Sequence, residues 1–99
     1  MNNALYMPED QAPDLYAGGG WSYATVGQEG YAKWYHVGDT AGKTMTVQLP
    51  ASGGFWIYDG QGRLTASSVL WGDTSAVLPE DGMVVFAGDA GVRFHLRFA

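Results

Sequence analysis

Apolar and polar residues alternate along most of the chain after residue 20, in short segments. The clearest segment is residues 92–98, in which Val92, Phe94, Leu96 and Phe98 fall on one face and the basic residues on the other. A period of two residues is typical of a β-strand with one buried and one solvated face. Seven other segments share this character. The eight predicted strands are residues 21–26, 31–37, 43–49, 54–58, 63–67, 74–78, 83–87 and 92–98.

Glycine, aspartate and proline clusters separate these strands. Residues 55–67 are predicted to form a hairpin around the turn Asp59-Gly-Gln-Gly, because glycine adopts positive φ and the Asp59 side chain can accept bonds from nearby backbone amides. Further turns are predicted at residues 79–82 and 88–91. No amphipathic helix of useful length is present. The pattern predicts an all-β antiparallel sandwich of the jelly-roll or immunoglobulin-like kind. The expected core residues are Met45, Val47, Leu49, Phe55, Ile57, Val84, Phe86, Phe94 and Leu96.

The chain of 99 residues shows no break in composition and is expected to form one sandwich domain at residues 21–99. Residues 1–20 contain Pro8, Pro13 and three consecutive glycines. They are predicted to form a loose N-terminal arm with at most one short strand, around residues 5–7.

Residues 38–44, Gly-Asp-Thr-Ala-Gly-Lys-Thr, end like a phosphate-binding loop. That motif needs four residues between its first glycine and the Gly-Lys-Thr, and a helix after it. Here three residues intervene, and residues 43–49 alternate as a strand does. Without a helix N-terminus there is no array of amides directed at a phosphate. The segment is predicted to be a turn that leads into a strand.

Ten acidic and five scattered basic residues give a net charge of −5, which argues against binding of nucleic acid or of an anionic membrane surface. The apolar stretches are too short for membrane insertion. There is no cysteine, which excludes disulfides and thiol catalysis. The first residues lack the basic and apolar regions of a signal peptide, so none is expected in this chain.

Candidate catalytic groups are sparse, and the chain is predicted not to be an enzyme. The two histidines, His36 and His95, lie within predicted strands, and no serine has a Gly-x-Ser-x-Gly setting. Adjacent acids occur in predicted turns or in the arm, which does not imply two carboxyl groups facing each other across a sugar.

No cofactor is expected, with calcium as the alternative. Calcium takes several oxygen ligands from flexible loops, and the chain has acids in such places, although no Asp-x-Asp-x-Asp ladder is present. The candidate ligands are Glu9, Asp10, Asp14, Asp39, Asp59, Asp73 and Asp89.

The aromatic residues are the most informative group. In residues 55–58, the period of two puts Trp56 and Tyr58 on the face opposite Phe55 and Ile57. In residues 31–37, Trp34 and His36 likewise lie opposite Tyr35 and Val37. If the core is filled by Phe55, Ile57, Tyr35 and Val37, the opposite residues form an aromatic cluster on the outer face. Large apolar patches on a surface usually serve docking. The alternative is that residues 1–20 fold over it. The candidate ligand-binding residues are Trp34, Trp56, Tyr58 and Trp71.

The order of motifs in residues 31–99 resembles the bacterial prepeptidase C-terminal (PPC) domain. The shared elements are an aromatic strand, a Gly-Lys-Thr-x-Thr-Val strand, a Tyr-Asp-x-x-Gly hairpin, a Leu-Pro-x-x-Gly turn and a closing aromatic strand. The segment Val-Phe-Ala-Gly-Asp-Ala-Gly is similar to domains appended to serine hydrolases of the β-lactamase type.

Either resemblance implies a non-catalytic accessory module of a secreted or cell-surface hydrolase, outside the cell. Such a module is expected to be a monomer that binds a polymer, polysaccharide or protein, through the aromatic face. The alternative is a structural interaction domain that packs against its parent catalytic domain and has no ligand of its own.

Overall fold

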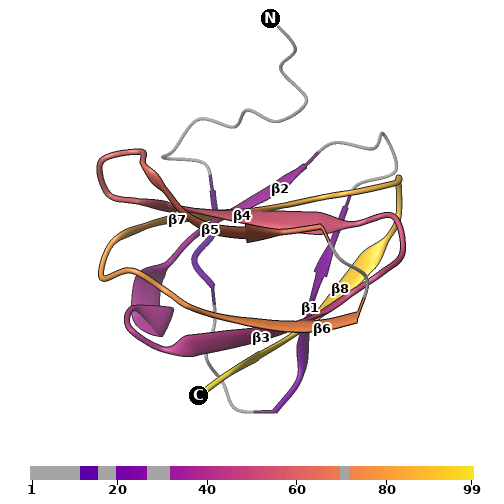
Figure 1. Cartoon of the computed structure of the whole chain (residues 1–99), viewed down its shortest axis with the longest axis horizontal. Coiled ribbons are helices and arrows are strands. Elements are labelled where there is room, and N and C mark those ends of the chain that lie inside the picture. Colours follow the sequence, from indigo (N-terminus) through magenta and orange to yellow (C-terminus); the bar gives the residue numbers. More distant parts are fainter. Residues whose placement is uncertain (1–11, 16–19, 27–31, 70–71) are drawn as a thin grey trace, which may run out of the picture.

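A computed structural model of the chain describes residues 12–15, 20–26, 32–69 and 72–99. It is an all-β structure with two four-stranded sheets packed face to face (Figure 1). In the described residues the one helical element is the three-residue 3-10 turn η3, Gly38–Thr40. None of the helical structure described is long and apolar enough to cross a membrane. The strands are β1 (Ser22–Thr25), β2 (Lys33–His36), β3 (Thr44–Leu49), β4 (Gly54–Asp59), β5 (Leu64–Ser68), β6 (Gly72–Val77), β7 (Gly82–Ala87) and β8 (Arg93–Phe98).

The strand order defines the fold. One sheet has the order β1-β8-β3-β6 and the other β2-β7-β4-β5, with all neighbours antiparallel. The pairs β1·β8, β2·β7, β3·β6 and β4·β5 are those of one long antiparallel ribbon rolled into a sandwich. This is the eight-stranded jelly-roll connectivity. The predicted all-β sandwich is confirmed. Of the two kinds predicted, jelly-roll and immunoglobulin-like, the strand order matches the jelly roll.

All eight predicted strands are present, with ends that differ from the prediction by at most two residues. The segment predicted at residues 31–37, for example, forms Lys33–His36, and the one predicted at 74–78 forms Gly72–Val77. The short strand predicted around residues 5–7 lies outside the described residues.

The core lies between the two sheets and contains all nine side chains that the alternation predicted. Phe86 is at its centre, with ring centroids 6.5 Å from Phe55 and 5.2 Å from Phe94. Tyr35 packs edge-on against Phe86 at 5.9 Å. Burial of the phenol raises the pKa of Tyr35 above its ordinary value of 10.0, because the charged form is disfavoured away from water.

Residues 38–44 form a turn and the start of a strand, as predicted. The 3-10 turn η3 is closed by a hydrogen bond from the Thr40 N–H to the Val37 carbonyl, 3.0 Å long. The buried Thr40 hydroxyl donates to the same carbonyl. Lys43 is followed directly by β3, so no helix follows the glycine-rich turn.

Part of the segment predicted as a loose arm is hydrogen-bonded to the sandwich. The Leu15 N–H donates to the His36 carbonyl, and the His36 N–H donates to the Pro13 carbonyl, both at 2.8 Å. These bonds form a parallel bridge at the edge strand β2. The Leu15 side chain is buried in the core cluster. Residues 13–15 are therefore packed on the sandwich domain.

Candidate functional site

The register of the β2-β7-β4-β5 sheet brings three of the four predicted site residues to one outer face. Trp34 and Trp56 both lie opposite Val85, one on each side of β7. Tyr58 lies opposite Met83 in the next row of that face. Although Val85 points away from the core, its side chain is only 3% exposed. The two indoles flank an apolar side chain that is itself removed from water.

Trp34 and Tyr58 are the closest aromatic pair on this face. Their rings are stacked, with centroids 6.0 Å apart and an angle of 25° between the planes. Both side chains are half-buried. Trp34 Nε1 is buried and has no hydrogen-bond partner among the described residues. Among the described residues, packing against neighbours such as Tyr58 holds this indole in place.

The Trp56 indole packs against the surface of the sheet at Gly54, which precedes it by two residues on the same face. A Cβ atom at Gly54 would stand 3.1 Å from Trp56 Cη2, so the missing side chain leaves room for the indole. Trp56 is half-buried as a result. The predicted outer aromatic cluster is therefore partly covered and not a flat, fully exposed surface. The fourth predicted residue, Trp71, lies outside the described residues.

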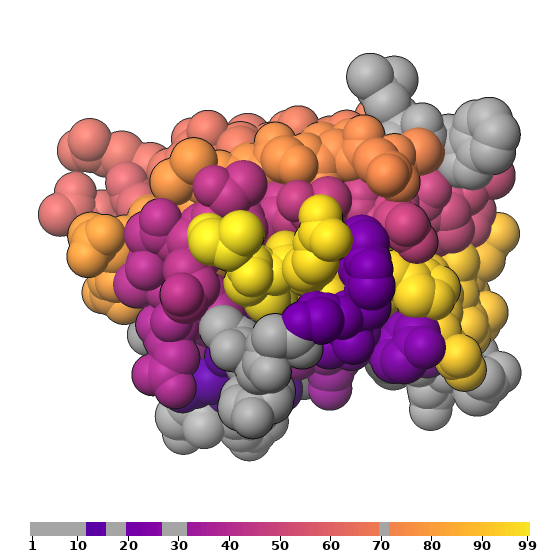
Figure 2. Space-filling model, turned by 90° about the horizontal axis from the view of Figure 1, so that it is seen from below, coloured from indigo at the N-terminus to yellow at the C-terminus, as the bar shows by residue number. Residues whose placement is uncertain are grey.

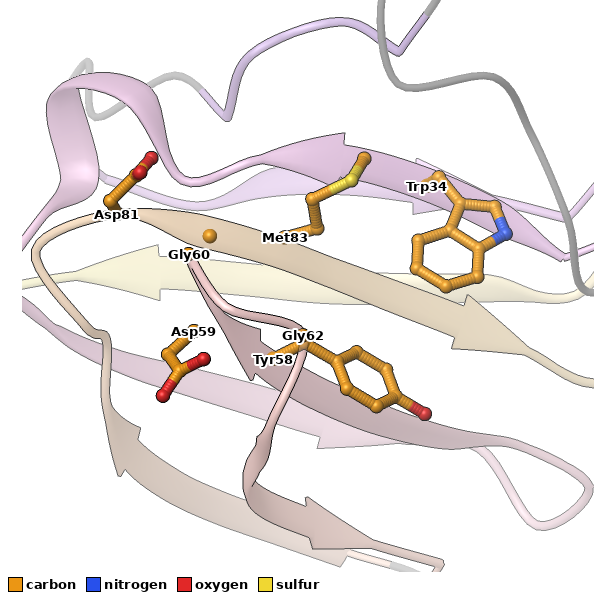
Figure 3. Close-up of a pocket in the computed structure, with 8 residues that line it drawn as sticks. Trp34, Tyr58, Asp59, Gly60, Gly62, Asp81 and Met83 are labelled. Atoms are coloured by element: carbon orange, nitrogen blue, oxygen red, sulfur yellow. The ribbon is translucent and has the colours of Figure 1, made fainter.

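A half-open pocket of about 290 Å³ starts at the Trp34–Tyr58 pair (Figure 3). The two rings stand at one end of it, two carboxylates stand at the other, and Met83 lies between them. Glycines at the turns keep the acidic end free of further side chains. The lining residues are Trp34, Tyr58, Asp59, Gly60, Gly62, Asp81, Gly82 and Met83.

Asp59 is positioned by the hairpin turn that the sequence predicted. Its Oδ1 accepts hydrogen bonds from the backbone N–H of Gln61 at 2.9 Å and of Arg63 at 3.0 Å. The bond from the Arg63 amide, followed by that from Gln61, lowers the pKa of Asp59 below its ordinary value of 3.8, because both donors favour the carboxylate. Asp59 thus stays ionised at the mouth of the pocket.

Asp81 reaches the same place from the turn before β7. A Cβ atom at Gly60 would lie 2.6 Å from Asp81 Oδ2, so the carboxylate rests against the bare backbone of the neighbouring turn. At Gly82 the backbones of β4 and β7 approach so closely that a side chain there would meet the Tyr58 carbonyl. Two turns far apart in sequence are in this way held against each other.

The other candidate chemistries are dispersed over the molecule. His36 lies in β2 and His95 in β8, which belong to different sheets. Asp39, Asp73 and Asp89 lie in separate elements, at η3, in β6 and before β8. Within the described ranges no three His, Asp or Glu side chains are grouped so that they could hold a metal ion. Glu9 and Asp10 lie outside those ranges.

Sequence reasoning missed a second aromatic group, on the outer face of the β1-β8-β3-β6 sheet. Trp21 and Tyr23 are 42% and 58% exposed, more than any of the predicted site residues described. They contact the basic side chains of β8. The alternation of residues 92–98 placed those basic residues on the wet face, but no local signal identified β1 as their neighbour.

Comparisons with protein-family models, with curated proteins and with solved structures find no match to this chain. The resemblance to PPC domains stays a prediction from motifs.

Proposed function

We propose that this domain is a non-catalytic binding module that takes a sugar polymer in the pocket between Trp34, Tyr58 and the two turns. Following the resemblance of residues 31–99, the module belongs to a secreted or cell-surface hydrolase. The observation that carries the proposal is the pairing of stacked rings with two carboxylates across one concave site.

The chemistry of the pocket matches that of a sugar ring. One face of a pyranose presents polarised C–H bonds, which are attracted to the electron-rich face of an aromatic ring. The hydroxyl groups at its rim are hydrogen-bond donors, and carboxylate oxygens such as those of Asp59 and Asp81 accept such bonds. An apolar wall with a few oriented polar groups is the usual composition of a small-ligand site.

The environment of Asp59 favours a role in binding over proton donation. Oδ1 of Asp59 is engaged by two backbone amides, and its pKa is lowered, which is the opposite of what a general acid requires. The proposal therefore assigns Asp59 to recognition and to the shape of the turn.

The alternative, a structural domain that packs on its parent enzyme, has an observation of its own. Three apolar side chains at the edges of the sheets are exposed: Leu64 in the edge strand β5, Val69 directly after it, and Val77 at the end of β6. Exposed apolar side chains at the edge of a domain often form part of an interface with another domain. This function would need no ligand at the pocket.

Binding of the wild-type domain to cellulose, peptidoglycan and collagen, followed by a Tyr58→Ala variant, tests the proposal. We expect retention on a sugar polymer and a loss of about 2 kcal/mol of binding in Tyr58→Ala, since aromatic anchors dominate such contacts. Val77→Ala, an exposed side chain at the end of β6 on the opposite sheet, is the control and should leave this binding unchanged.

A Trp56→Ala variant separates the two functions. The binding module predicts that the wild type is retained on the polymer and that this variant keeps that retention with a moderate loss of stability, because the half-buried Trp56 lies outside the pocket lining. A stability loss of several kcal/mol, with no polymer retained by the wild type, favours the structural domain. Retention on collagen alone would contradict the assignment to a sugar.

A further inference from the structure

The outer face of the β1-β8-β3-β6 sheet concentrates positive charge in an otherwise acidic domain. Arg93, His95 and Arg97 alternate along β8 and all point outward, opposite the core side chains of the same strand. Two of the five basic residues of a chain with net charge −5 therefore lie on one strand, with a histidine between them. In Figure 2, which looks onto this face, the side chains of β8 (yellow) and β1 (indigo) lie side by side.

Each guanidinium lies over an exposed aromatic ring. The Arg97 guanidinium carbon is 5.0 Å from the centroid of Trp21, and that of Arg93 is 5.2 Å from the centroid of Tyr23. His95 meets Tyr23 edge-on at 4.8 Å. The N–H donors of a guanidinium lie in the plane of the group, where they can form a two-pronged pair with a carboxylate. The rings hold the arginines in position without occupying these donors.

Neutral hydrogen-bonding side chains continue the rows across the sheet. Thr46 lies opposite Arg97 and Gln48 opposite His95, both on β3. The Thr46 hydroxyl is 3.0 Å from that of Ser75 on β6. The face thus offers broad rings, fixed cations and hydroxyl or amide groups in one plane, a combination suited to a flat ligand with both hydroxyl and carboxylate groups.

We propose that this face is a second binding site, for a polysaccharide whose sugar units carry carboxylate groups. The rings take the C–H faces of the sugars, and Arg93 and Arg97 pair with the carboxylates. A nucleic acid fits less well, because it carries a phosphate at every step and only two arginines are present to replace its counterions. Asp73 stands opposite Gln48, two strands from His95, so the carboxylates bind over β1 and β8.

The test compares polygalacturonate with the same polymer methyl-esterified, by affinity electrophoresis or calorimetry. The wild-type domain should bind the acid form and lose most of this binding when the carboxylates are esterified or when salt is raised. Arg97→Gln should weaken binding about 10-fold or more, as expected for a charge-assisted pair. Arg63→Gln removes the same charge from the turn between β4 and β5, beside the other sheet, and should change binding less than about 2-fold.

Each remaining outcome overturns the proposal. Equal binding of the acid and its methyl ester would show that the arginines do not recognise carboxylates. An equal loss in Arg63→Gln would reduce the effect to net charge. Tighter binding of single-stranded DNA than of polygalacturonate would assign the face to a nucleic acid. Tyr58→Ala, which removes a ring from the pocket on the other sheet, should leave polygalacturonate binding intact, so the two sites are judged independently.

Discussion

Replacement of Phe94 by alanine should cause one of the largest stability losses in this domain. The ring is fully buried, stands 5.2 Å from the Phe86 centroid and touches the backbone of the turn before β4. A Cβ at Gly53 would lie 2.6 Å from Phe94 Cζ, so the ring tip is pressed against main chain that has no side chain to move into the space. Loss of the buried ring and the cavity left behind should cost about 3 to 5 kcal/mol.

That loss is a large share of the roughly 5 to 15 kcal/mol that holds a domain of this kind together. With an m-value in the usual range of about 1 to 3 kcal/mol/M, the midpoint of urea unfolding should fall by about 2 M. Circular dichroism and tryptophan fluorescence should give the same midpoint. Phe98→Ala is the matched control, because Phe98 is on the same face of β8 but only partly buried. A loss below about 1.5 kcal/mol in Phe94→Ala, or one equal to that in Phe98→Ala, would contradict the tight packing described.

Three further changes test local features. Gly82→Ala should cost at least about 2 kcal/mol in a thermal melt, because φ is +141° there and the new methyl would meet the Tyr58 carbonyl; an unchanged melt would refute that close approach. Asp59 contributes stability above its unfolded pKa, and this contribution is lost as pH falls through its lowered folded pKa. Melts between about pH 5 and pH 2 should show this loss in the wild type and not in Asp59→Asn; parallel curves would refute it. Titration with magnesium ATP should leave the amide resonances of residues 38–44 unmoved; saturable shifts would make Lys43 part of a nucleotide site.

The strands and the core could be predicted because both follow from local physics. A period of two residues decides which side chains share a face, whatever the neighbouring strand is. Phe94 and Leu96 could therefore be assigned to the core from residues 92–98 alone. The turn at Asp59 was equally local, since its carboxylate bonds amides two and four residues along the chain.

The candidate site could be predicted only in part, because it depends on which strands are neighbours. Trp34 and Tyr58 meet across β7, an arrangement that the sequence does not encode at short range. The orientation of the Trp56 indole depends on the space left by Gly54. The carboxylate of Asp81 comes from a turn about 20 residues further along the chain than Asp59. The contact of Trp21 with Arg97 requires that β1 pairs with β8, and no sequence motif predicted that pairing.

The position of β8 has a consequence for how the domain reaches its native state. This strand comes after the other seven described strands in sequence, yet it lies between β1 and β3 inside its sheet. The bond from the Ser22 hydroxyl to the Leu96 carbonyl joins residues 74 positions apart. Closing so long a loop costs entropy before any contact is gained, and chains dominated by such pairings fold in milliseconds to seconds. On a ribosome, β1 and the edge of β3 that pairs with β8 stay unpaired until residues 93–98 emerge. During that interval these exposed edges are open to association with other chains.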